Sequence, residues 1–149
     1  MLRPNRKTWL WLLFAAYCLV MLWLLLFHRI GTELMPLRYN LRPWDTVNRY
    51  LWVLRHSTDS LQRRYATANL VGNMVLFLPF GIFLPALFIK VRTLGRFSLV
   101  VILIILSVEF LQLFTGLGAL DVDDVILNLL GIFFGFLLWH LACNRREKT

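Results

Sequence analysis

WLWLLFAAYCLVMLWLLLF, residues 9–27, contains no charged side chain and decides the fold class of this chain. A helix needs about 20 largely apolar residues to cross a bilayer. Three further stretches satisfy this criterion, residues 70–89, 97–115 and 125–143, and they are interrupted only by prolines, glycines and a few polar side chains. The sequence therefore predicts an all-α polytopic membrane protein, built as a four-helix transmembrane bundle.

The composition favours the same fold class. Hydrophobic residues make up 59% of the chain and charged residues 16%, whereas soluble domains average about 25% charged residues. This balance excludes a water-soluble globule, a disordered chain and a disulfide scaffold. Four spans within 149 residues leave little room for a soluble domain, so a single transmembrane domain over residues 1–149 is expected. The first span is longer than the roughly 7–15 apolar residues of a signal peptide, and we expect it to be retained.

The basic residues predict the orientation in the membrane. In a chain this apolar, the net charge of +8 indicates contact with anionic lipid headgroups rather than with nucleic acid. The basic residues that closely flank the spans form three groups: Arg3, Arg6 and Lys7; Lys90, Arg92 and Arg96; Arg145, Arg146 and Lys148. These groups share one side of a four-span protein, which predicts that both termini are cytoplasmic. The extracytoplasmic connection, residues 28–69, opposes this assignment because it holds seven arginines.

This long connection contains a second kind of helix. Trp44, Val47, Leu51 and Leu54 recur at helical spacing, and Pro43 precedes them as a helix start. The pattern predicts a short amphipathic helix on the membrane surface, with arginines at the lipid phosphates. A re-entrant or protein-packed segment is the alternative.

Polar side chains inside the spans mark the candidate site. An ionisable side chain in a membrane span is a functional-site candidate by default, and Glu109 is the one acidic residue of this kind. Spans two and four begin on the side of the membrane where span three ends, so their polar residues fall in one layer. The predicted binding residues of this layer and the adjoining acidic run are Asn73, Glu109, Gln112, Asp121, Asp124 and Asn128.

The chemistry of this layer has several explanations. Acidic groups at one depth raise one another's pKa or require a cation or basic partner. Candidate partners are Arg63, Arg64 or another arginine of the connection, a bound divalent cation, or the proton of a neutral Glu109. Asp121, Asp124 and Glu109 are the candidate metal ligands, and Glu109 is the candidate catalytic acid or base. Alternatively, the amides hold the helices together and part of the acidic run caps the fourth span.

Small residues predict how the fourth span packs. Gly131 and Gly135 form a GxxxG pair on the same helical stripe as Asp124 and Asn128. Such a pair lets another helix approach closely. In the second span, Pro79 and Pro85 remove two amide donors, which requires neighbours or water to satisfy the carbonyls they would have bonded.

Three motifs in this order resemble the VanZ-like family. NLVGNMVLFLPFG, residues 69–81, is similar to the first family signature, and SVEFLQ, residues 107–112, with DVDDVILNLLG, residues 121–131, is similar to the second. Asn40-Leu41-Arg42-Pro43-Trp44 resembles the family's upstream Asn-Leu-x-Pro-Phe stretch. The resemblance extends over residues 38–139. Members often carry an arginine shortly before the acidic run, and this chain has none in residues 116–120.

The resemblance implies a bacterial inner-membrane protein, and the family's namesake is linked to resistance to teicoplanin, a lipid-tailed glycopeptide. Three hypotheses follow. The first is a membrane protein that modulates the cell envelope by binding an amphiphile, such as a lipoglycopeptide, or a lipid headgroup. The second is an enzyme acting on a lipid-linked cell-wall precursor with a carboxylate-held cation. The third, a small transporter, ranks last because the sequence has no internal repeat.

Overall fold

The computed structural model describes residues 5–27, 39–115 and 120–146. Four long helices dominate it, α1 (Arg6–Phe27), α3 (Ser60–Leu87), α4 (Leu94–Thr115) and α5 (Val122–Arg146). The shorter elements are β1 (Tyr39–Asn40), α2 (Asp45–His56), the 3₁₀ turn η1 (Ile89–Val91) and β2 (Leu120–Asp121). The four long helices are long and apolar enough to cross a membrane. The expected all-α membrane bundle is therefore confirmed.

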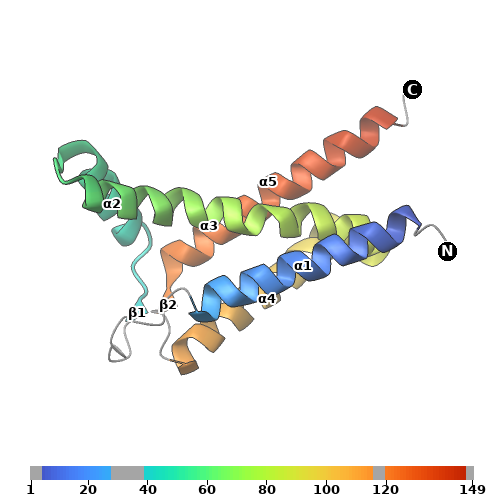
Figure 1. The fold of residues 1–149 in the computed structure, drawn as a ribbon, viewed down its shortest axis with the longest axis horizontal. Helices are drawn as coiled ribbons and strands as arrows, with labels where there is room; N and C mark the ends of the chain where they lie inside the picture. Colours follow the sequence, from blue (N-terminus) through green and yellow to red (C-terminus); the bar gives the residue numbers. More distant parts are fainter. Residues whose placement is uncertain (1–4, 28–38, 116–119, 147–149) are drawn as a thin grey trace.

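The two ends of the bundle differ in what they carry. The start of α1 and the end of α5 lie at one end, together with the η1 connection between α3 and α4 (Figure 1). The opposite end carries α2, the first turns of α3 and the two short strands (Figure 1). The structure thus has the expected four-span arrangement, with the start of α1 and the end of α5 at the same end of the bundle.

α3 begins earlier than its apolar stretch. The hydropathy pattern placed residues 60–69 in the connection, whereas the structure makes them the first turns of α3. Asp59 caps this start, because its side chain accepts a hydrogen bond of 2.8 Å from the Leu61 amide. The helix thus projects as a polar extension, and α2 packs against it.

α3 and α5 pack backbone to backbone. A Cβ on Gly131 would collide with the Met74 carbonyl of α3, and one on Gly135 would collide with the Leu78 carbonyl. Gly81 of α3 faces Gly135 in return, with 2.8 Å between a Cβ built on Gly81 and the Cα of Gly135. The predicted close approach at the GxxxG pair is confirmed, and α3 is the partner helix.

The apolar core lies where α3, α4 and α5 meet. Its fully buried side chains come from all three helices and are Phe77, Phe97, Val101, Ile105 and Ile132. α1 adds the buried side chain of Met21, and its Tyr17 hydroxyl donates a 2.7 Å hydrogen bond to the Leu76 carbonyl of α3.

Both prolines remain inside α3, and polar neighbours lie beside them. The Leu76 carbonyl that receives Tyr17 lies one turn before Pro79. At the other end, Arg92 Nε donates to the Pro85 carbonyl at 2.9 Å. Neighbouring side chains thus bind backbone carbonyls in the proline-containing half of α3.

Candidate functional site

A two-residue strand pair joins the connection to the acidic run. β1 runs parallel to β2, with Tyr39 opposite Leu120 and Asn40 opposite Asp121. This pairing brings the Asn-Leu-Arg-Pro-Trp stretch onto the start of α5, although some 80 residues separate them in the sequence. Two of the sequence motifs therefore meet in one place.

Asp121 is a buried hub of this junction. Its Oδ2 accepts a 2.7 Å hydrogen bond from the Thr46 hydroxyl of α2. Its Oδ1 accepts from the Asp123 amide at 2.9 Å and from Asn40 Nδ2 at 3.4 Å. The Asp123 amide belongs to the first turn of α5, so Asp121 also caps its own helix, as the structural alternative in the sequence predicted.

Asp123 caps a different helix from its own. The side chain is fully buried, and its Oδ1 and Oδ2 accept from the backbone amides of Trp44 at 2.6 Å and Val47 at 3.0 Å. These amides belong to the N-terminal turn of α2, where free donors and the helix dipole favour an anion. Trp44 adopts a φ of 69° at this start and provides no side-chain cap itself. Asp123 therefore holds α2 onto α5.

Asp124 and Asn73 link the two central helices. Asn73 Nδ2 of α3 donates to Asp124 Oδ1 at 2.7 Å. The sequence placed both residues in one polar layer, and the structure brings them into contact.

Glu109 and Asn128 lie deeper, on α4 and α5. Glu109 is 2% exposed and Asn128 is 4% exposed. α4 packs against β2, so the helix of Glu109 adjoins the strand of Asp121. Asn128 Oδ1 is buried with no hydrogen-bond partner among the residues that the structure describes. The side chain of Gln112 lies outside the described part, and only its place on α4 is known.

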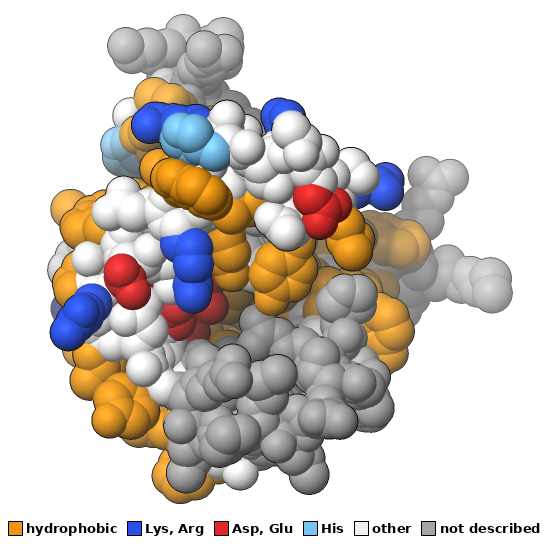
Figure 2. All heavy atoms as spheres, turned by 90° about the vertical axis from the view of Figure 1, so that its left-hand side faces the viewer, with side chains coloured by type: hydrophobic (Ala, Val, Ile, Leu, Met, Phe, Trp, Pro, Cys, Tyr) orange, Lys and Arg blue, Asp and Glu red, His pale blue; other side chains and the backbone are white. Residues whose placement is uncertain are grey.

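Arg49, an arginine of the connection, reaches this junction. Its Nη2 donates to Thr46 Oγ1 at 3.2 Å, and Thr46 in turn donates to Asp121. The two arginines named from the sequence, Arg63 and Arg64, are exposed on α3. At this end of the molecule, acidic and basic side chains lie next to each other (Figure 2).

Burial raises the pKa of Tyr50 to about 12, with further upward contributions from Tyr65 and Asp124. The phenol thus lies in the electric field of the acidic run and stays protonated at neutral pH. Tyr50 and Tyr65 contact each other edge to face, with ring centroids 6.2 Å apart.

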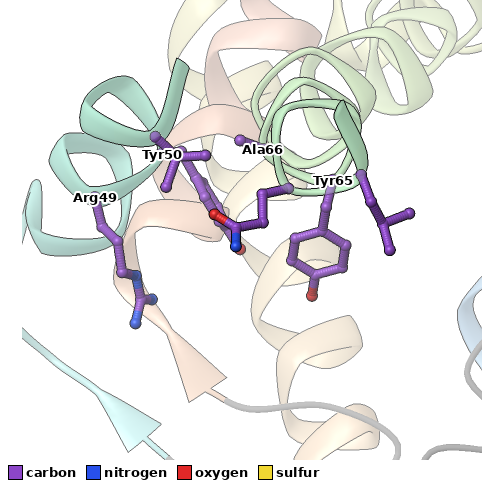
Figure 3. Close-up of a pocket in the computed structure, with 7 residues that line it drawn as sticks. Arg49, Tyr50, Tyr65 and Ala66 are labelled. Carbon is purple, nitrogen blue, oxygen red and sulfur yellow. The ribbon is translucent and has the colours of Figure 1, made fainter. Parts of the chain in front are cut away.

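A cavity opens beside these tyrosines, between α2 and α3. Its volume is about 470 Å³, and Figure 3 shows the side chains around it. The lining residues are Arg49, Tyr50, Val53, Leu61, Gln62, Tyr65 and Ala66. The sequence predicted neither this cavity nor the role of Thr46, and it included Arg49 only among the unnamed arginines of the connection. The amphipathic pattern of α2 was the available signal, but it does not specify which helix packs against α2.

The acidic residues that the structure describes do not form a recognisable metal site. Within residues 5–27, 39–115 and 120–146 there is no group of three or more His, Cys, Asp or Glu side chains placed to hold a metal ion. Asp121 and Asp123 instead accept hydrogen bonds from protein donors at four atoms.

The fold and this junction define a polytopic membrane protein with a buried polar cluster at one end. A family model described as VanZ/LLP1 matches residues 14–143, and the chain belongs to that family. It is similar to Protein VanZ of Enterococcus faecium, with 31% identity over 135 residues that cover 87% of this chain and 73% of that protein. No solved structure matches the chain. The resemblance read from the motifs is thereby confirmed.

Proposed function

We propose that this protein resides in the bacterial inner membrane with both termini in the cytoplasm, and that it binds an amphiphile or lipid headgroup in the outer leaflet. Binding of this kind would modulate the envelope and contribute to resistance to glycopeptides such as teicoplanin. The proposal rests on one observation: buried carboxylates and amides of α4, β2 and α5, together with the half-buried Asn73 of α3, gather at the end of the bundle that carries α2.

The roles within this cluster differ. Asp121 and Asp123 hold the start of α2, which assigns them to the framework. Glu109 and Asn128 are buried polar residues inside the bundle. Buried polar atoms are normally hydrogen-bonded, so Asn128 Oδ1 is where we expect a donor group of the ligand.

Glu109→Gln tests this function. The substitution keeps the size of the side chain and removes its ability to ionise. In a susceptible bacterium producing the protein, we expect the variant to lose any protection against teicoplanin while its level in the membrane is unchanged. Growth inhibition and membrane immunoblots give the two readouts.

Ser107→Ala is the matched control. Ser107 lies two residues earlier on α4, is exposed, and its hydroxyl donates to the Leu103 carbonyl of the same helix. This variant should behave as the parent protein does. Full protection by Glu109→Gln would contradict the assignment of Glu109 to the site.

The second candidate function is catalysis on a lipid-linked cell-wall precursor. Its support is Glu109, a carboxyl group buried at the same end as the acidic run, which suits a general acid or base. A divalent cation held by Asp121, Asp124 or Glu109 belongs to this hypothesis. It predicts different lipid and lipid-precursor pools in membranes with the protein and with Glu109→Gln, and identical pools would exclude it.

A further inference from the structure

The cavity between α2 and α3 lies outside the apolar part of the bundle. α3 lines it with Leu61, Gln62, Tyr65 and Ala66, whereas the apolar stretch of this helix begins only at residue 70. At about 1.5 Å per residue along a helix, these residues lie about 6–14 Å beyond the start of that stretch. This places the cavity at the lipid headgroups and the adjoining water rather than in the bilayer interior.

The surface of the cavity is almost entirely apolar. Val53 of α2, Leu61 and Ala66 of α3 and the rings of Tyr50 and Tyr65 provide it. The volume of about 470 Å³ lies within the range of about 300–1,000 Å³ typical of small-molecule sites. A hollow with these walls accommodates an apolar group.

The polar side chains of the lining are already engaged by the protein. Arg49 Nη2 donates to Thr46 Oγ1 at 3.2 Å, and the guanidinium carbon lies 5.8 Å from the centre of the Tyr50 ring. Figure 3 shows the Arg49 side chain on the α2 side of the cavity. Gln62 Oε1 accepts from the Ser57 hydroxyl at 3.1 Å. These contacts leave the hydrocarbon surface as what the cavity offers to a ligand.

Charges of both signs act on this cavity. Burial is the main cause of the raised pKa of Tyr50, and Tyr65 adds to it. The carboxylates of Asp124 and Asp121 raise this pKa further, whereas the guanidinium of Arg49 lowers it. The acidic run would repel an anion in the cavity, and Arg49 would repel a cation. The lining therefore favours an uncharged group.

Two apolar side chains of the lining are left exposed. Leu61 is 73% exposed and Tyr65 is 64% exposed, in a polar part of α3. A hydrocarbon chain that already lies in the bilayer interior gains little from covering them, because it is already out of water. A chain that comes from water gains the full transfer free energy, which corresponds to about fourfold in affinity per buried methylene.

We propose that this cavity holds the hydrocarbon tail of a single-tailed amphiphile that reaches the protein from the aqueous phase. This tail site rests on the proposed function, in which an amphiphile is the ligand, and it assigns the tail to α2 and α3. The polar head of the ligand then lies outside the cavity, beside the junction where Arg49 contacts Thr46 and Thr46 contacts Asp121. The tail, and not the charge of the head, provides the binding free energy at this site.

Photolabelling of the full-length protein in dioleoylphosphatidylcholine nanodiscs tests the tail site. The probe is dodecanoyl lysophosphatidylcholine with a diazirine at the end of its chain, and labelled tryptic peptides are quantified by mass spectrometry. Cleavage after arginine gives the cavity peptides 50–55 and 56–63, and peptide 97–145 contains most of α4 as a reference for probe dissolved in the bilayer. We expect labelling of the cavity peptides to saturate, whereas labelling of the reference peptide rises in proportion to the probe.

Competition identifies the part of the ligand that is bound. Unlabelled dodecanoyl lysophosphatidylcholine should displace the probe from the cavity peptides. Glycerophosphocholine, which has the same head and no tail, should not displace it. Displacement by glycerophosphocholine, or cavity labelling that saturates no more than the reference, would overturn the proposal. A second copy of the chain seated in the cavity would leave peptides 50–55 and 56–63 unlabelled, which would overturn it as well.

Two substitutions fill the cavity from opposite sides. Val53→Trp enlarges a side chain of α2, and Leu61→Trp enlarges an exposed side chain of α3. Each should reduce saturable labelling by about tenfold or more, because excluding two methylenes costs about fourfold each. Leu51→Trp is the matched control, since Leu51 is an exposed leucine of α2 that does not line the cavity. Saturable labelling that survives in both filled variants, or that falls equally in the control, would overturn the proposal.

The tail site and the proposed function can fail separately. Glu109→Gln should keep the saturable labelling even where it loses protection against teicoplanin. A parent protein that protects against teicoplanin but shows no saturable labelling would overturn the tail site alone. Full protection by Val53→Trp and Leu61→Trp after their labelling is lost would overturn the assignment of this tail site to the proposed function.

Discussion

Asp123 is a buried carboxylate of α5 that caps the start of α2. A carboxylate with no exposed surface is strongly disfavoured unless donors surround it. Here both oxygens accept backbone amides at the start of α2, which are donors that the helix itself leaves unused. The side chain of Trp44, at the N-cap position, has no oxygen that could accept from those amides. One residue of α5 therefore supplies the cap that the sequence of α2 lacks.

Asp123→Asn should destabilise the protein by about 3 kcal/mol, because one charged acceptor is lost and an amide N–H group faces a backbone donor. Hydrogen exchange at the Trp44 and Val47 amides should accelerate most. Asp45→Asn is the control, since Asp45 is an exposed aspartate in the first turn of α2, the turn that Asp123 caps. It should change stability by only a few tenths of a kcal/mol. Equal effects of the two variants would contradict the capping role.

Tyr50 makes a prediction about pH. Its pKa rises from the ordinary 10.0 to about 12, first through burial and then through Tyr65 and Asp124. Above pH 10 the unfolded chain loses this proton while the folded protein keeps it, so stability falls as the pH rises from about 10 to about 12. Absorbance at the phenolate band should show a tyrosine titrating near 12 that Tyr50→Phe removes. A Tyr50 that ionises near 10 would contradict its burial.

At the scale of elements, the contact of α3 with α5 organises the bundle. Three glycines remove the side chains that would separate the two backbones, and each lies opposite a carbonyl or a Cα of the other helix. In lipid, where apolar burial provides no driving force between helices, such close packing is a principal source of association. The same interface positions Asn73 against Asp124, so packing and polar contacts depend on one register.

Gly131→Ala should destabilise this interface by about 3 kcal/mol, since its Cβ would collide with the Met74 backbone carbonyl and a helix would have to move. Gly72→Ala is the matched control on α3. A Cβ there meets no described atom within 4 Å, and alanine favours the helix. Thermal unfolding in detergent compares the two. A Gly131→Ala protein as stable as Gly72→Ala would contradict the backbone contact.

Local sequence predicted the elements better than their contacts. The apolar stretch at 97–115 differs from α4 by three residues at its start, because hydropathy defines a membrane-spanning helix over most of its length. Hydropathy failed to predict a helix at residues 60–69, because α3 begins at the Asp59 cap and runs through polar residues there. The sequence did not predict the contact of Thr46 with Asp121, because it joins residues 75 positions apart, next to a β1–β2 pairing that no local pattern specifies.

At the scale of the whole molecule, both ends of the bundle carry basic residues, but only one of them also carries the acidic run. The end with the termini carries basic residues in short flanks, including Lys7, Lys90 and Arg96, all exposed. The opposite end also carries arginines, but there they accompany the acidic run, and Arg49 is tied to it through Thr46. Because both ends are rich in basic residues, a count of Lys and Arg alone does not determine which end faces the cytoplasm.

Site-directed labelling decides the orientation. The proposed function requires the acidic cluster to face outward, so α2 must be accessible in intact cells. In a protein whose Cys18 and Cys143 are replaced by alanine, a membrane-impermeant maleimide should label Arg55→Cys directly. Lys7→Cys, exposed at the other end, should react only after the cells are permeabilised. The reverse pattern would place the cluster and the α2–α3 cavity in the cytoplasmic leaflet, out of reach of an external glycopeptide, and would contradict the proposed function.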